Sequence, residues 1–587
     1  MTKILLTAVN AKYIHSNPAV YSLRAYARAY QETETDIVIK EYTINHQIED
    51  ILAGIYREQP GVLCFSCYIW NISYVEELAE EFHKLCPNVP IWVGGPEVSY
   101  ETEAFLERNP AVFGVMLGEG EQTFLELCAH YADSACGGAP FRACSEQVCG
   151  GKLSEIAGIV YRSGEEICRT AVRAPLALSQ IPFCYEELAD FSNRIIYYES
   201  SRGCPFRCSY CLSSVDKQLR FRDLRMVEKE LAFFLEKKVP QVKFVDRTFN
   251  CKHEHAMEIW RFIAAHDNGV TNFHFEISAD LLTEEELKLL ASMRPGLVQL
   301  EIGVQSTNDA TISEIHRTMD LKRLGECVER VKAGRNIHQH LDLIAGLPYE
   351  DYDTFGRSFD EVYAWLPDQL QLGFLKVLKG SYLYEHAREY GMKYRTKPPY
   401  EVLETKWLPF SDVLRIRQAE EMLEVYYNSG QYQVTMQLLG TQFDSAFAMY
   451  QRLGAFYERR GYFAMSHTRM RRAEILLAFA KEEAKEAADV IRESLIFDLY
   501  ARENMKSRPV WADELAEWKA LTRACCKNGK LSHVERFSYE LIGLGQQSLR
   551  ALPPRREQPV YVLFDYTRRN ALDRQAYCRY ITEVEQE

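Results

Sequence analysis

Three cysteines with metal-binding spacing, Cys204, Cys208 and Cys211, follow the apolar stretch 194–200 of this 587-residue chain. The C-x3-C-x2-C spacing allows three thiolates to converge on one iron–sulfur cube through a tight loop. Because a cube has four irons, three cysteines leave one iron open to a small molecule, whereas an electron-carrying cluster usually has four. The alternative is a zinc site, which normally takes four ligands, often as two C-x2-C pairs, and no second pair follows. The spacing therefore predicts an iron–sulfur cluster with catalytic potential.

The same motif resembles that of the radical S-adenosylmethionine (SAM) enzymes, including the aromatic residue, Tyr210, before the last cysteine. In that family, the amine and carboxylate of SAM chelate the open iron, and an electron from the cluster cleaves SAM to a 5′-deoxyadenosyl radical. The resemblance implies that Cys204, Cys208 and Cys211 are the catalytic ligands of a [4Fe-4S] cluster and that Tyr210 lies beside the cofactors.

The chain before this motif alternates apolar strands with helical patterns. The expected strands are 3–8, 36–42, 61–66, 90–94 and 113–117, the expected helices are 19–30 and 72–85, and a hairpin is expected over 159–162 and 166–169. This alternation predicts an α/β fold, with a doubly wound, Rossmann-like domain over residues 1–180. Ligands of such sheets bind outside the carboxyl ends of the strands.

Three of these strand ends carry glycines and polar side chains. The candidate cofactor-binding residues are Ser66, Tyr68, Gly94, Gly95, Pro96, Glu97, Gly118, Glu119, Gly120, Glu121 and Thr123. Glycines there allow the backbone to approach a large flat ligand and to donate amide hydrogen bonds. In this order, ahead of the cysteine motif, the loops look like the cobalamin-binding domains of cobalamin-dependent radical enzymes.

The chain departs from other cobalamin proteins because it lacks the D-x-H-x-x-G motif that supplies a lower axial histidine. His15 follows the first expected strand without that context. It is either a cobalt ligand or, as we favour, a polar loop residue near the ligand. In many members of the resembling group, the absence of a lower ligand favours cobalt(I) and methyl transfer.

The cysteine motif begins a second series of strands and helices. The expected strands are 194–200, 241–245, 273–277, 298–303, 339–344 and 369–376, and the helices between them include 226–237, 284–292 and 321–333. They predict a partial (β/α)6 barrel over residues 181–395, as the resemblance also implies. Functional residues of such barrels gather at the carboxyl ends of the strands.

The resemblance assigns SAM-binding roles to polar residues at these strand ends. They are Asp246 near the methionyl amine, Glu276 or Ser278 at the ribose hydroxyls, Glu301 and Gln305 on the fourth strand, with Gln305 at the carboxylate or ribose, and Gly346. Gly346 lies in a stretch, 342–348, that resembles the G-x-I-x-G-x-x element packing against adenine, although Asp342 replaces its first glycine. The alternative for each acidic residue is an ion pair at the mouth of the barrel.

Residues 396–587 are predicted to form a mostly helical domain, with helix-period patterns over 414–427, 444–459 and 469–504 and a strand over 558–566. In the resembling group this region shapes substrate access. A Gly/Ser/Cys-rich stretch, 132–152, contains Cys136, Cys144 and Cys149, and we predict a mobile surface loop there rather than a metal site.

Composition limits the partners and the compartment. The chain is 47% hydrophobic and 26% charged, which is typical of a globular protein, and no apolar run approaches the roughly 20 residues that span a bilayer. A net charge of −14 argues against a nucleic-acid partner. The 17 cysteines of a long chain without a signal peptide are expected to be reduced thiols, which predicts a cytoplasmic location without membrane attachment.

These observations predict an enzyme that uses a [4Fe-4S] cluster, SAM and cobalamin, most simply a methyltransferase acting on an unactivated carbon. Its substrate would be a small molecule or a peptide, and a flavodoxin- or ferredoxin-type protein would supply electrons. Ring contraction or cyclisation without methyl transfer is the close alternative. A methylthiotransferase is disfavoured because Cys64, Cys67 and Cys86 are too closely spaced for its auxiliary cluster. A cobalamin or redox sensor would not need an open iron.

Overall fold

The computed structural model describes residues 2–32, 35–133, 152–185, 187–215, 218–514 and 531–581. The chain divides into two compact units. Unit 1 contains Met1–Glu276 together with two later segments, Lys376–Glu389 and Lys393–Val402. Unit 2 contains Ile277–Leu375, Tyr390–Met392 and Leu403–Glu587. The domain boundaries expected at residues 180 and 395 stay a prediction.

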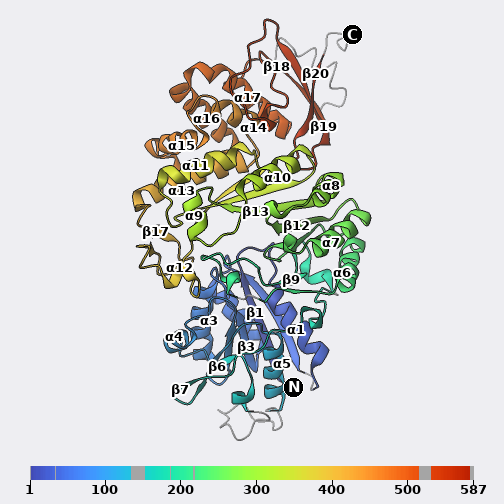
Figure 1. Cartoon of the computed structure of the whole chain (residues 1–587), viewed down its shortest axis with the longest axis vertical. Coiled ribbons are helices and arrows are strands. Elements are labelled where there is room, and N and C mark those ends of the chain that lie inside the picture. The colour runs from blue at the N-terminus through green and yellow to red at the C-terminus, as the bar shows by residue number, and fades with distance from the viewer. Residues whose placement is uncertain are drawn as a thin grey trace. The chain divides into compact units, whose positions relative to one another are not determined.

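The first part of unit 1 is a seven-stranded sheet with the order β2-β1-β3-β4-β5-β6-β7 (Figure 1). Its strands are β1 (Lys3–Asn10), β2 (Asp36–Thr43), β3 (Val62–Ser66), β4 (Ile91–Gly94), β5 (Gly114–Met116), β6 (Ile159–Ser163) and β7 (Glu166–Arg169). The first five strands are parallel, and β6 and β7 form an antiparallel hairpin that extends the sheet beyond β5. The parallel strands bring their carboxyl ends to one edge, where the glycine-rich loops begin.

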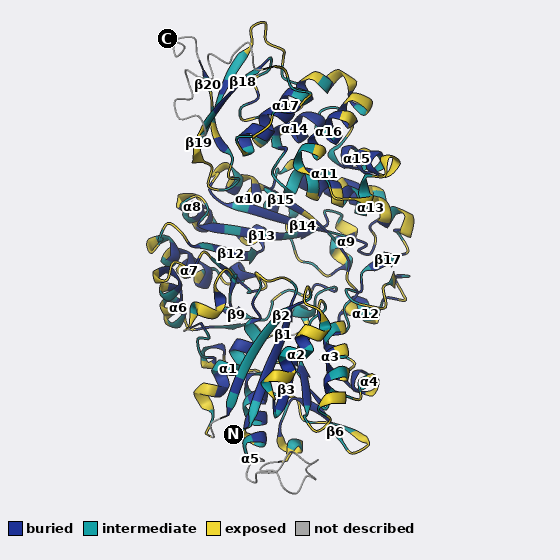
Figure 2. Cartoon of the chain, turned by 180° about the vertical axis from the view of Figure 1, so that it is seen from behind, coloured by how far each residue is buried: buried dark blue, intermediate teal, exposed yellow. Residues whose placement is uncertain are grey.

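Helices cover both faces of this sheet, as expected for a doubly wound fold. They are α1 (Pro18–Tyr30), α2 (Ile48–Glu58), α3 (Ile72–Leu85), α4 (Thr102–Arg108) and α5 (Glu121–Asp133). Helices α1 and α5 pack against each other, and α2, α3 and α4 share a core with the strands on the other face. Strand β1 is buried along almost its whole length (Figure 2). The predicted Rossmann-like fold is confirmed, with the expected strands and helices ending within two residues of the observed ones.

Unit 1 also contains the start of the barrel. Strands β8 (Ile196–Tyr198), β11 (Gln241–Phe244) and β12 (Asn272–Ile277) run parallel in the order β12-β11-β8, with helices α6 (Leu224–Glu236) and α7 (His253–Ala265) between them. The short strands β9 (Ser201–Arg202) and β10 (Arg220–Phe221) pair antiparallel and enclose the cysteine loop between them.

The remaining barrel strands belong to unit 2. They are β13 (Val298–Gln305), β14 (His338–Ala345) and β15 (Gln369–Phe374), parallel in the order β15-β14-β13. Helices α8 (Glu284–Ser292), α9 (Asp309–Glu314), α10 (Leu321–Ala333) and α11 (Tyr352–Ala364) accompany them. Along β13, fully buried residues alternate with half-buried ones, so one face is packed on helices while the other remains partly accessible.

Two segments of the chain return to unit 1 after β15. They contain α12 (Tyr382–Glu385), β16 (Lys393–Tyr394) and, at the end of the second segment, the beginning of β17 (Val402–Glu404). The hydroxyl of Tyr384 donates to Glu101 at 2.5 Å, and the backbone amide of Leu383 donates to the carbonyl of Ser209 at 3.0 Å. This return segment, 376–402 without 390–392, therefore contacts both the β4 loop and the cysteine loop of unit 1.

The C-terminal part of unit 2 is mostly helical, as predicted. Its helices are α13 (Phe410–Leu423), continued by a π-helical turn (Glu424–Asn428), α14 (Gln433–Gly440), α15 (Ala446–Arg460), α16 (Arg469–Glu483) and α17 (Ala488–Arg502). The stretch expected to be helical over 469–504 is two helices separated by a short 3-10 turn, Lys485–Ala487.

A small antiparallel sheet in the order β18-β19-β20 packs against α17. Its strands are β18 (Ser532–Phe537), β19 (Val560–Arg569) and β20 (Ala576–Ile581), of which only β19 was expected from the sequence. Most of the cysteine-rich stretch 132–152, with Cys136, Cys144 and Cys149, lies outside the described residues. In the described part of the chain, no helix combines the length and the apolar character needed to cross a bilayer.

Candidate cofactor site

A cavity of about 550 Å³ lies in unit 1 at the carboxyl ends of strands β3, β4 and β5. This volume is in the ordinary range for small-molecule and cofactor sites. The first turns of α1 and the strand-end loops form one side of it, and residues from the linker and the start of the barrel form the other. The position agrees with the rule that ligands of doubly wound sheets bind beyond the carboxyl ends of the strands.

Most of the residues predicted for this site line the cavity. They are Ser66, Tyr68, Gly94, Gly95, Pro96, Gly118, Glu119, Gly120 and Glu121. Glu97 and Thr123 are not among the lining residues. Glu97 accepts a hydrogen bond from Tyr400 of the return segment, and burial raises the pKa of its carboxyl. The Thr123 hydroxyl is fully buried and accepts from Arg173 Nε at 2.7 Å.

The glycines at two of these strand ends have different surroundings. Gly95 has φ +118°, and a Cβ atom there would clash with the carbonyl oxygen of Cys67. Gly118 has φ +66°, and a Cβ atom there would meet no described atom within 4 Å. The cavity wall is therefore tightly packed at Gly95 and open at Gly118.

Ser66 is held at the end of β3 by two asparagines. Asn17 Nδ2 donates to Ser66 Oγ at 2.8 Å, and Asn71 Nδ2 donates to the Ser66 carbonyl at the same distance. Among the described residues, no donor reaches the buried Oδ1 of Asn17. This acceptor beside the cavity suits a ligand that carries amide groups, as the corrin ring of cobalamin does.

His15 does not line the cavity. Its Nδ1 lies 2.5 Å from the hydroxyl of Tyr197, which does line it. Burial, together with the charges of Lys12 and Lys243, lowers the pKa of His15 and favours the neutral imidazole. The arrangement agrees with the favoured reading of His15 as a polar loop residue near the ligand.

The other side of the cavity comes from residues that sequence reasoning did not assign to this site. They include Leu178, Ile181, Phe183, Cys184, Tyr185, Tyr198, Glu199, Arg202, Arg222 and Glu230. Arg222 pairs with Glu230 at 2.5 Å and donates to the carbonyls of Leu178 and Ile181, so that it fixes the linker against α6. In the sequence, only Arg202, beside the cysteine motif, and the linker that ends at Pro182 were expected near the cofactors.

The three cysteines lie on a loop of unit 1 whose backbone is constrained at both ends. Gly203 has φ +97°, and a Cβ atom there would lie 2.5 Å from the carbonyl oxygen of Gln218, so only glycine fits before Cys204. The amide of Cys211 donates to the carbonyl of Cys208 at 3.1 Å. Cys208 is buried, whereas Cys204 and Cys211 are half-buried.

The three sulfur atoms do not gather within 4.8 Å of one another, as far as the described residues go. Thiolates around one tetrahedral zinc ion would lie closer, at about 3.8 Å, because each Zn–S bond is about 2.3 Å long. In this arrangement the three sulfurs do not form a tetrahedral zinc site, and the cube stays the prediction of the motif.

Asp246 lies behind the cysteine loop and is fully buried. It accepts hydrogen bonds from the Ser200 hydroxyl and the Ser201 hydroxyl, each at 2.6 Å, and from the Ser200 amide at 3.0 Å. His255 Nε2 lies 3.0 Å from the same Ser200 hydroxyl. Burial raises the pKa of Asp246 to about 6 and lowers that of His255 to about 4. This network fixes the strand that leads into the cysteines.

The remaining predicted SAM-binding residues are divided between the units. Glu276 is in unit 1, where the ammonium of Lys243 lies 3.8 Å from its carboxylate. Ser278 is in unit 2 and donates to Asp280 at 2.6 Å. At the end of β13, Gln305 has φ +72° and a buried Oε1 without a hydrogen-bond partner in the described part of the chain. Gly346 has φ +90° directly after β14.

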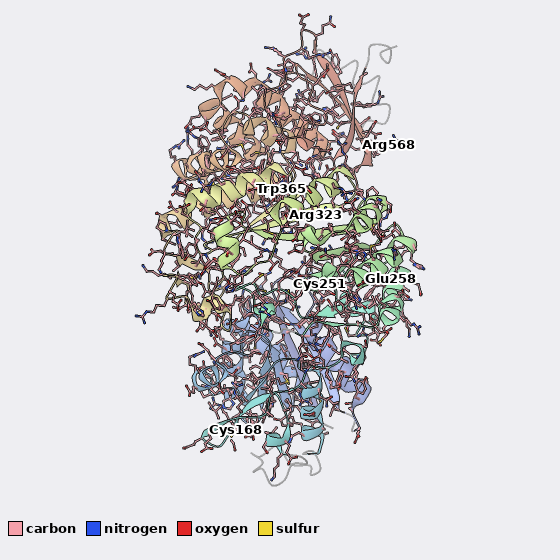
Figure 3. All side chains as sticks on the ribbon, in the orientation of Figure 1. Cys168, Cys251, Glu258, Arg323, Trp365 and Arg568 are labelled. Carbon is pink, nitrogen blue, oxygen red and sulfur yellow. The ribbon has the colours of Figure 1, made fainter. Side chains whose placement is uncertain are left out.

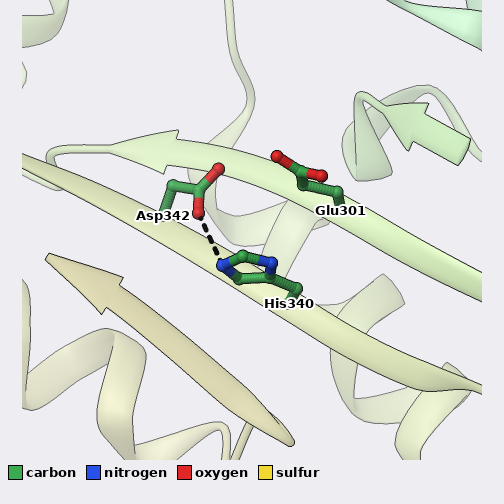
Figure 4. Close-up of side chains that lie close together, drawn as sticks. All are labelled: Glu301, His340 and Asp342. Carbon is green, nitrogen blue, oxygen red and sulfur yellow. Dashed lines mark ion pairs between the residues drawn. The ribbon is translucent and has the colours of Figure 1, made fainter. Parts of the chain in front are cut away.

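Glu301 lies on the half-buried face of β13, next to His340 and Asp342 on β14 (Figure 4). His340 Nε2 is 3.1 Å from Asp342 Oδ1, and one ligand atom from each of the three side chains lies within 4.8 Å of the others. Asp342, which replaces a glycine of the resembling motif, therefore faces the same side of the sheet as Glu301.

Two further thiols of unit 1, Cys168 and Cys251, are labelled in Figure 3. Cys168 lies on β7, and Cys251 ends a short 3-10 turn after β11. Burial, followed by the proximity of Cys204, raises the pKa of Cys251 to about 11, so this thiol is protonated at neutral pH. Neither cysteine lines the cavity.

Three family models match the chain. Residues 4–128 match the B12 binding domain. The segment 198–362, which contains all three cysteines, matches the radical SAM superfamily. The chain therefore combines a cobalamin (B12)-binding domain with a radical SAM domain. Residues 388–540 match a family described as a protein of unknown function, DUF4080. The predicted cofactors, cobalamin, SAM and a [4Fe-4S] cluster, are those of radical SAM proteins with a B12-binding domain.

Individual members of the family are similar to this chain at low identity. The cobalamin-dependent radical SAM methyltransferase TokK of Streptomyces tokunonensis is 25% identical over 52% of this chain and 45% of its own length. An anaerobic magnesium-protoporphyrin IX monomethyl ester cyclase of Cereibacter sphaeroides is 23% identical over 54% of this chain and 52% of its own. The chain thus spans about half the length of these curated relatives.

The fold is similar to that of a solved family member, the radical SAM methyltransferase TsrM from Kitasatospora setae. The TM-score is 0.55 at 15% identity, over 68% of this chain and 80% of the other. This likeness confirms the predicted fold class, including the barrel.

Proposed function

We propose that this protein is a cobalamin-dependent radical SAM enzyme that methylates an unactivated carbon of a small-molecule or peptide substrate. One observation carries the proposal: a cavity that suits cobalamin is bounded both by the strand-end loops of the first sheet and by residues that flank the three-cysteine loop, all within unit 1. When bound, the cluster supplies the electron that cleaves SAM, and cobalamin supplies the methyl group.

The residues of this chain have three tasks in the proposed reaction. Cys204, Cys208 and Cys211 hold three irons and leave the fourth to SAM. Ser66, Tyr68, Gly94, Gly95, Pro96, Gly118 and Gly120 shape the cobalamin wall, where the open surroundings of Gly118 allow close approach of the ring. Asp246 supports the cofactors indirectly. Its carboxylate accepts hydrogen bonds from the Ser200 and Ser201 hydroxyls, and in this way Asp246 orients the cysteine loop.

Tyr68 gives the cavity wall an aromatic surface at the end of β3. Its ring stacks on Trp70 with centroids 4.4 Å apart, and burial raises the pKa of its hydroxyl to about 12. A neutral phenol in this position excludes water from the cavity without adding charge. Exclusion of water is what radical chemistry requires of its site, since it protects reactive intermediates from side reactions.

The resemblance assigns SAM to Tyr210 and Glu276 of unit 1 and to Ser278, Glu301, Gln305 and Gly346 of unit 2, and we keep these assignments as part of the proposal. The unpartnered Oε1 of Gln305 and the positive φ of both Gln305 and Gly346 support a ligand at those strand ends. Strained backbone such as that of Gln305 is frequently found where a ligand binds.

The test begins with anaerobic protein, reconstituted with cluster and cobalamin and supplied with SAM and a chemical reductant. We expect corrinoid and cluster absorption, and formation of 5′-deoxyadenosine that is lost in Cys208→Ala. The matched control is Cys168→Ala, which removes a thiol of the same unit away from the cavity and is expected to behave as the parent. A Cys208→Ala protein that still forms 5′-deoxyadenosine contradicts the catalytic assignment.

Cyclisation or ring contraction without methyl transfer is the second candidate, and its support is the similarity to the cyclase of Cereibacter sphaeroides. The two candidates separate before the substrate is known. With SAM labelled in its methyl group, a methyltransferase is expected to place the label on the cobalamin extracted from the protein. A protein that cleaves SAM but never labels its cobalamin favours the cyclase.

The physiological partners follow from the chemistry. A flavodoxin- or ferredoxin-type protein would supply the electron, and the acidic net charge of −14 disfavours nucleic acid as a partner. An oxygen-labile cluster suits a reducing compartment, which supports the cytoplasmic location predicted above.

A further inference from the structure

Arg202, two residues before Cys204, is surrounded by three carboxylates. Its guanidinium contacts Glu199 through two bonds of 2.9 and 2.8 Å, Glu121 at 3.0 Å and Glu119 at 3.4 Å. Glu199 lies on the same side of the cysteine loop as Arg202. Glu119 lies instead in the loop after β5 and Glu121 is the first residue of α5, and both are on the opposite wall of the cavity. One side chain therefore joins the two walls.

A second arginine strengthens the same connection. Arg220 on β10 lies opposite Arg202 on β9 in the antiparallel strand register. Its guanidinium contacts both carboxylate oxygens of Glu119. Arg220 also donates to the carbonyl of Leu176 at 2.6 Å, and the amide of Leu176 donates to Glu119 at 3.2 Å. Glu119 is thus held by the strand after the cysteine loop and by the linker.

The charges in this group are well satisfied although the residues are largely buried. Burial acts to lower the pKa of Arg202, but Glu199, Glu121 and Glu119 raise it well above its usual value. Burial acts to raise the pKa of Glu119, and the hydrogen bond from Arg220 with the charge of Arg202 outweighs it, so that this pKa is lowered. Arg202 and Glu119 therefore remain ionised at neutral pH.

Such a group contributes geometry more than stability. A partly buried ion pair loses much of its Coulomb energy to desolvation, so the arrangement that it imposes is its main contribution. Several bonds from one planar guanidinium fix orientation as well as distance, which a lysine ammonium does not.

We propose that Arg202 is a positioning residue that locks the cobalamin-side loop, Gly118–Glu121, to the cysteine loop and so sets the separation of the two cofactors. This inference rests on the proposed function. Radical chemistry at two facing centres depends on that separation, because displacement of a reacting group by about 1 Å lowers a rate by orders of magnitude. The fork of the guanidinium is what the role requires.

The main experiment uses the full chain loaded with cluster and cobalamin. Pulsed electron paramagnetic resonance measures the distance distribution between paramagnetic cobalt and the reduced cluster. We expect Arg202→Gln to broaden this distribution at least twofold, and Arg202→Lys to leave it broad. The matched control is Arg169→Gln, which removes a bidentate Arg–Glu pair of the same unit, with Glu103, outside the cavity lining. It is expected to keep the parent distribution.

A parent-like distribution in Arg202→Gln overturns the inference, and full rescue by lysine overturns the part assigned to the guanidinium fork. Because Arg202→Gln is close to the cluster, Glu121→Gln serves as a second variant that leaves Arg202 and the cysteine loop untouched. We expect it to broaden the distribution by a smaller amount in the same direction.

A second measurement needs no cofactor. Backbone hydrogen exchange of the apo full chain is expected to quicken at least tenfold in Arg202→Gln, both over 118–123 and over 200–204. Faster exchange in the cysteine loop alone overturns the inference, since the two loops would then be independent. If the parent protein fails to bind cobalamin, the proposed function fails while the exchange result still decides whether Arg202 joins the loops.

Discussion

The two glycine loops at neighbouring strand ends of the first sheet look alike in sequence and differ in structure. After β4, Gly95 packs so closely on the backbone of Cys67 that no other residue fits. After β5, Gly118 has open space where a side chain would begin. The first glycine is required by the protein's own packing, and the second leaves room for something that is not protein. The same residue type thus serves the fold in one loop and the ligand in the other.

The largest effect is expected for Gly95→Ala. The added methyl would clash with the carbonyl of Cys67, and alanine would be strained at φ +118°. Strain and overpacking of this kind cost about 3 kcal/mol of the free energy of unfolding. Thermal unfolding of the full apo chain measures the loss, and a variant as stable as the parent would mean that the two loops do not differ as described.

Asp246 and His255 extend the comparison to residues that support the cysteine loop. The raised pKa of Asp246 favours its protonated form in the fold, so its contribution to stability falls as pH rises from about 4 to 6. The lowered pKa of His255 favours neutral imidazole, so its contribution rises between about pH 4 and 6.5. In the parent the two contributions oppose each other over the same range.

Removing one of the two groups is expected to expose the other. Asp246→Asn should leave a stability that rises with pH across this range, and His255→Gln one that falls, by up to about 3 kcal/mol each. Unfolding temperatures of the full chain between pH 4.5 and 6.5 give the slopes. Identical slopes in the two variants would show that these groups do not titrate as their burial implies.

Gly118→Ala tests the open loop. Left-handed φ costs alanine about 1 kcal/mol, so stability should fall only slightly, whereas cobalamin affinity should fall at least tenfold. Gly164→Ala is the matched control, because Gly164 has φ +64° and equally open surroundings on the β6–β7 hairpin outside the cavity lining. Equal affinity for cobalamin in the two variants would place the ligand elsewhere.

The smallest effect is expected for Thr123→Val. Its hydroxyl accepts from Arg173 inside the protein rather than facing the cavity. Loss of that hydrogen bond should cost about 1 kcal/mol of stability and leave cobalamin affinity within twofold of the parent. A large loss of affinity would return Thr123 to the binding residues.

The sequence predicted the first sheet and the barrel strands well because their apolar runs are long and regularly spaced. It did not predict β18, whose buried face carries His533 and Glu535, paired with each other at 2.6 Å. Polar residues on the packed side of a strand hide the alternation on which prediction depends. The division of 469–504 into two helices was not predicted either. Lys485–Ala487 consists of residues that favour helix, so the sequence shows no break there, and the turn is explained by the packing of α16 on α17.

The sequence predicted residues of one wall of the cavity but few of the other. Strand-end glycines identify one wall of the cavity, because a local pattern determines both their type and their place. The opposite wall is built by Arg222, Glu230 and the linker residues, which reach the cavity only through tertiary contacts. Glu97 and Thr123 are polar residues close to the strand-end loops, as predicted. Their side chains bond to Tyr400 and Arg173 instead of lining the cavity, which the spacing of residues in the sequence does not reveal.

The return segment has a consequence for biosynthesis. Unit 1 uses Tyr384 and Leu383 to hold its β4 loop and its cysteine loop, yet these residues are translated long after the rest of that unit, with much of unit 2 between them. While the ribosome is translating the barrel strands of unit 2, unit 1 does not yet have the hydrogen bonds from Leu383 and Tyr384. These two hydrogen bonds can therefore form only after residues 383 and 384 have been synthesised, long after the loops that they hold.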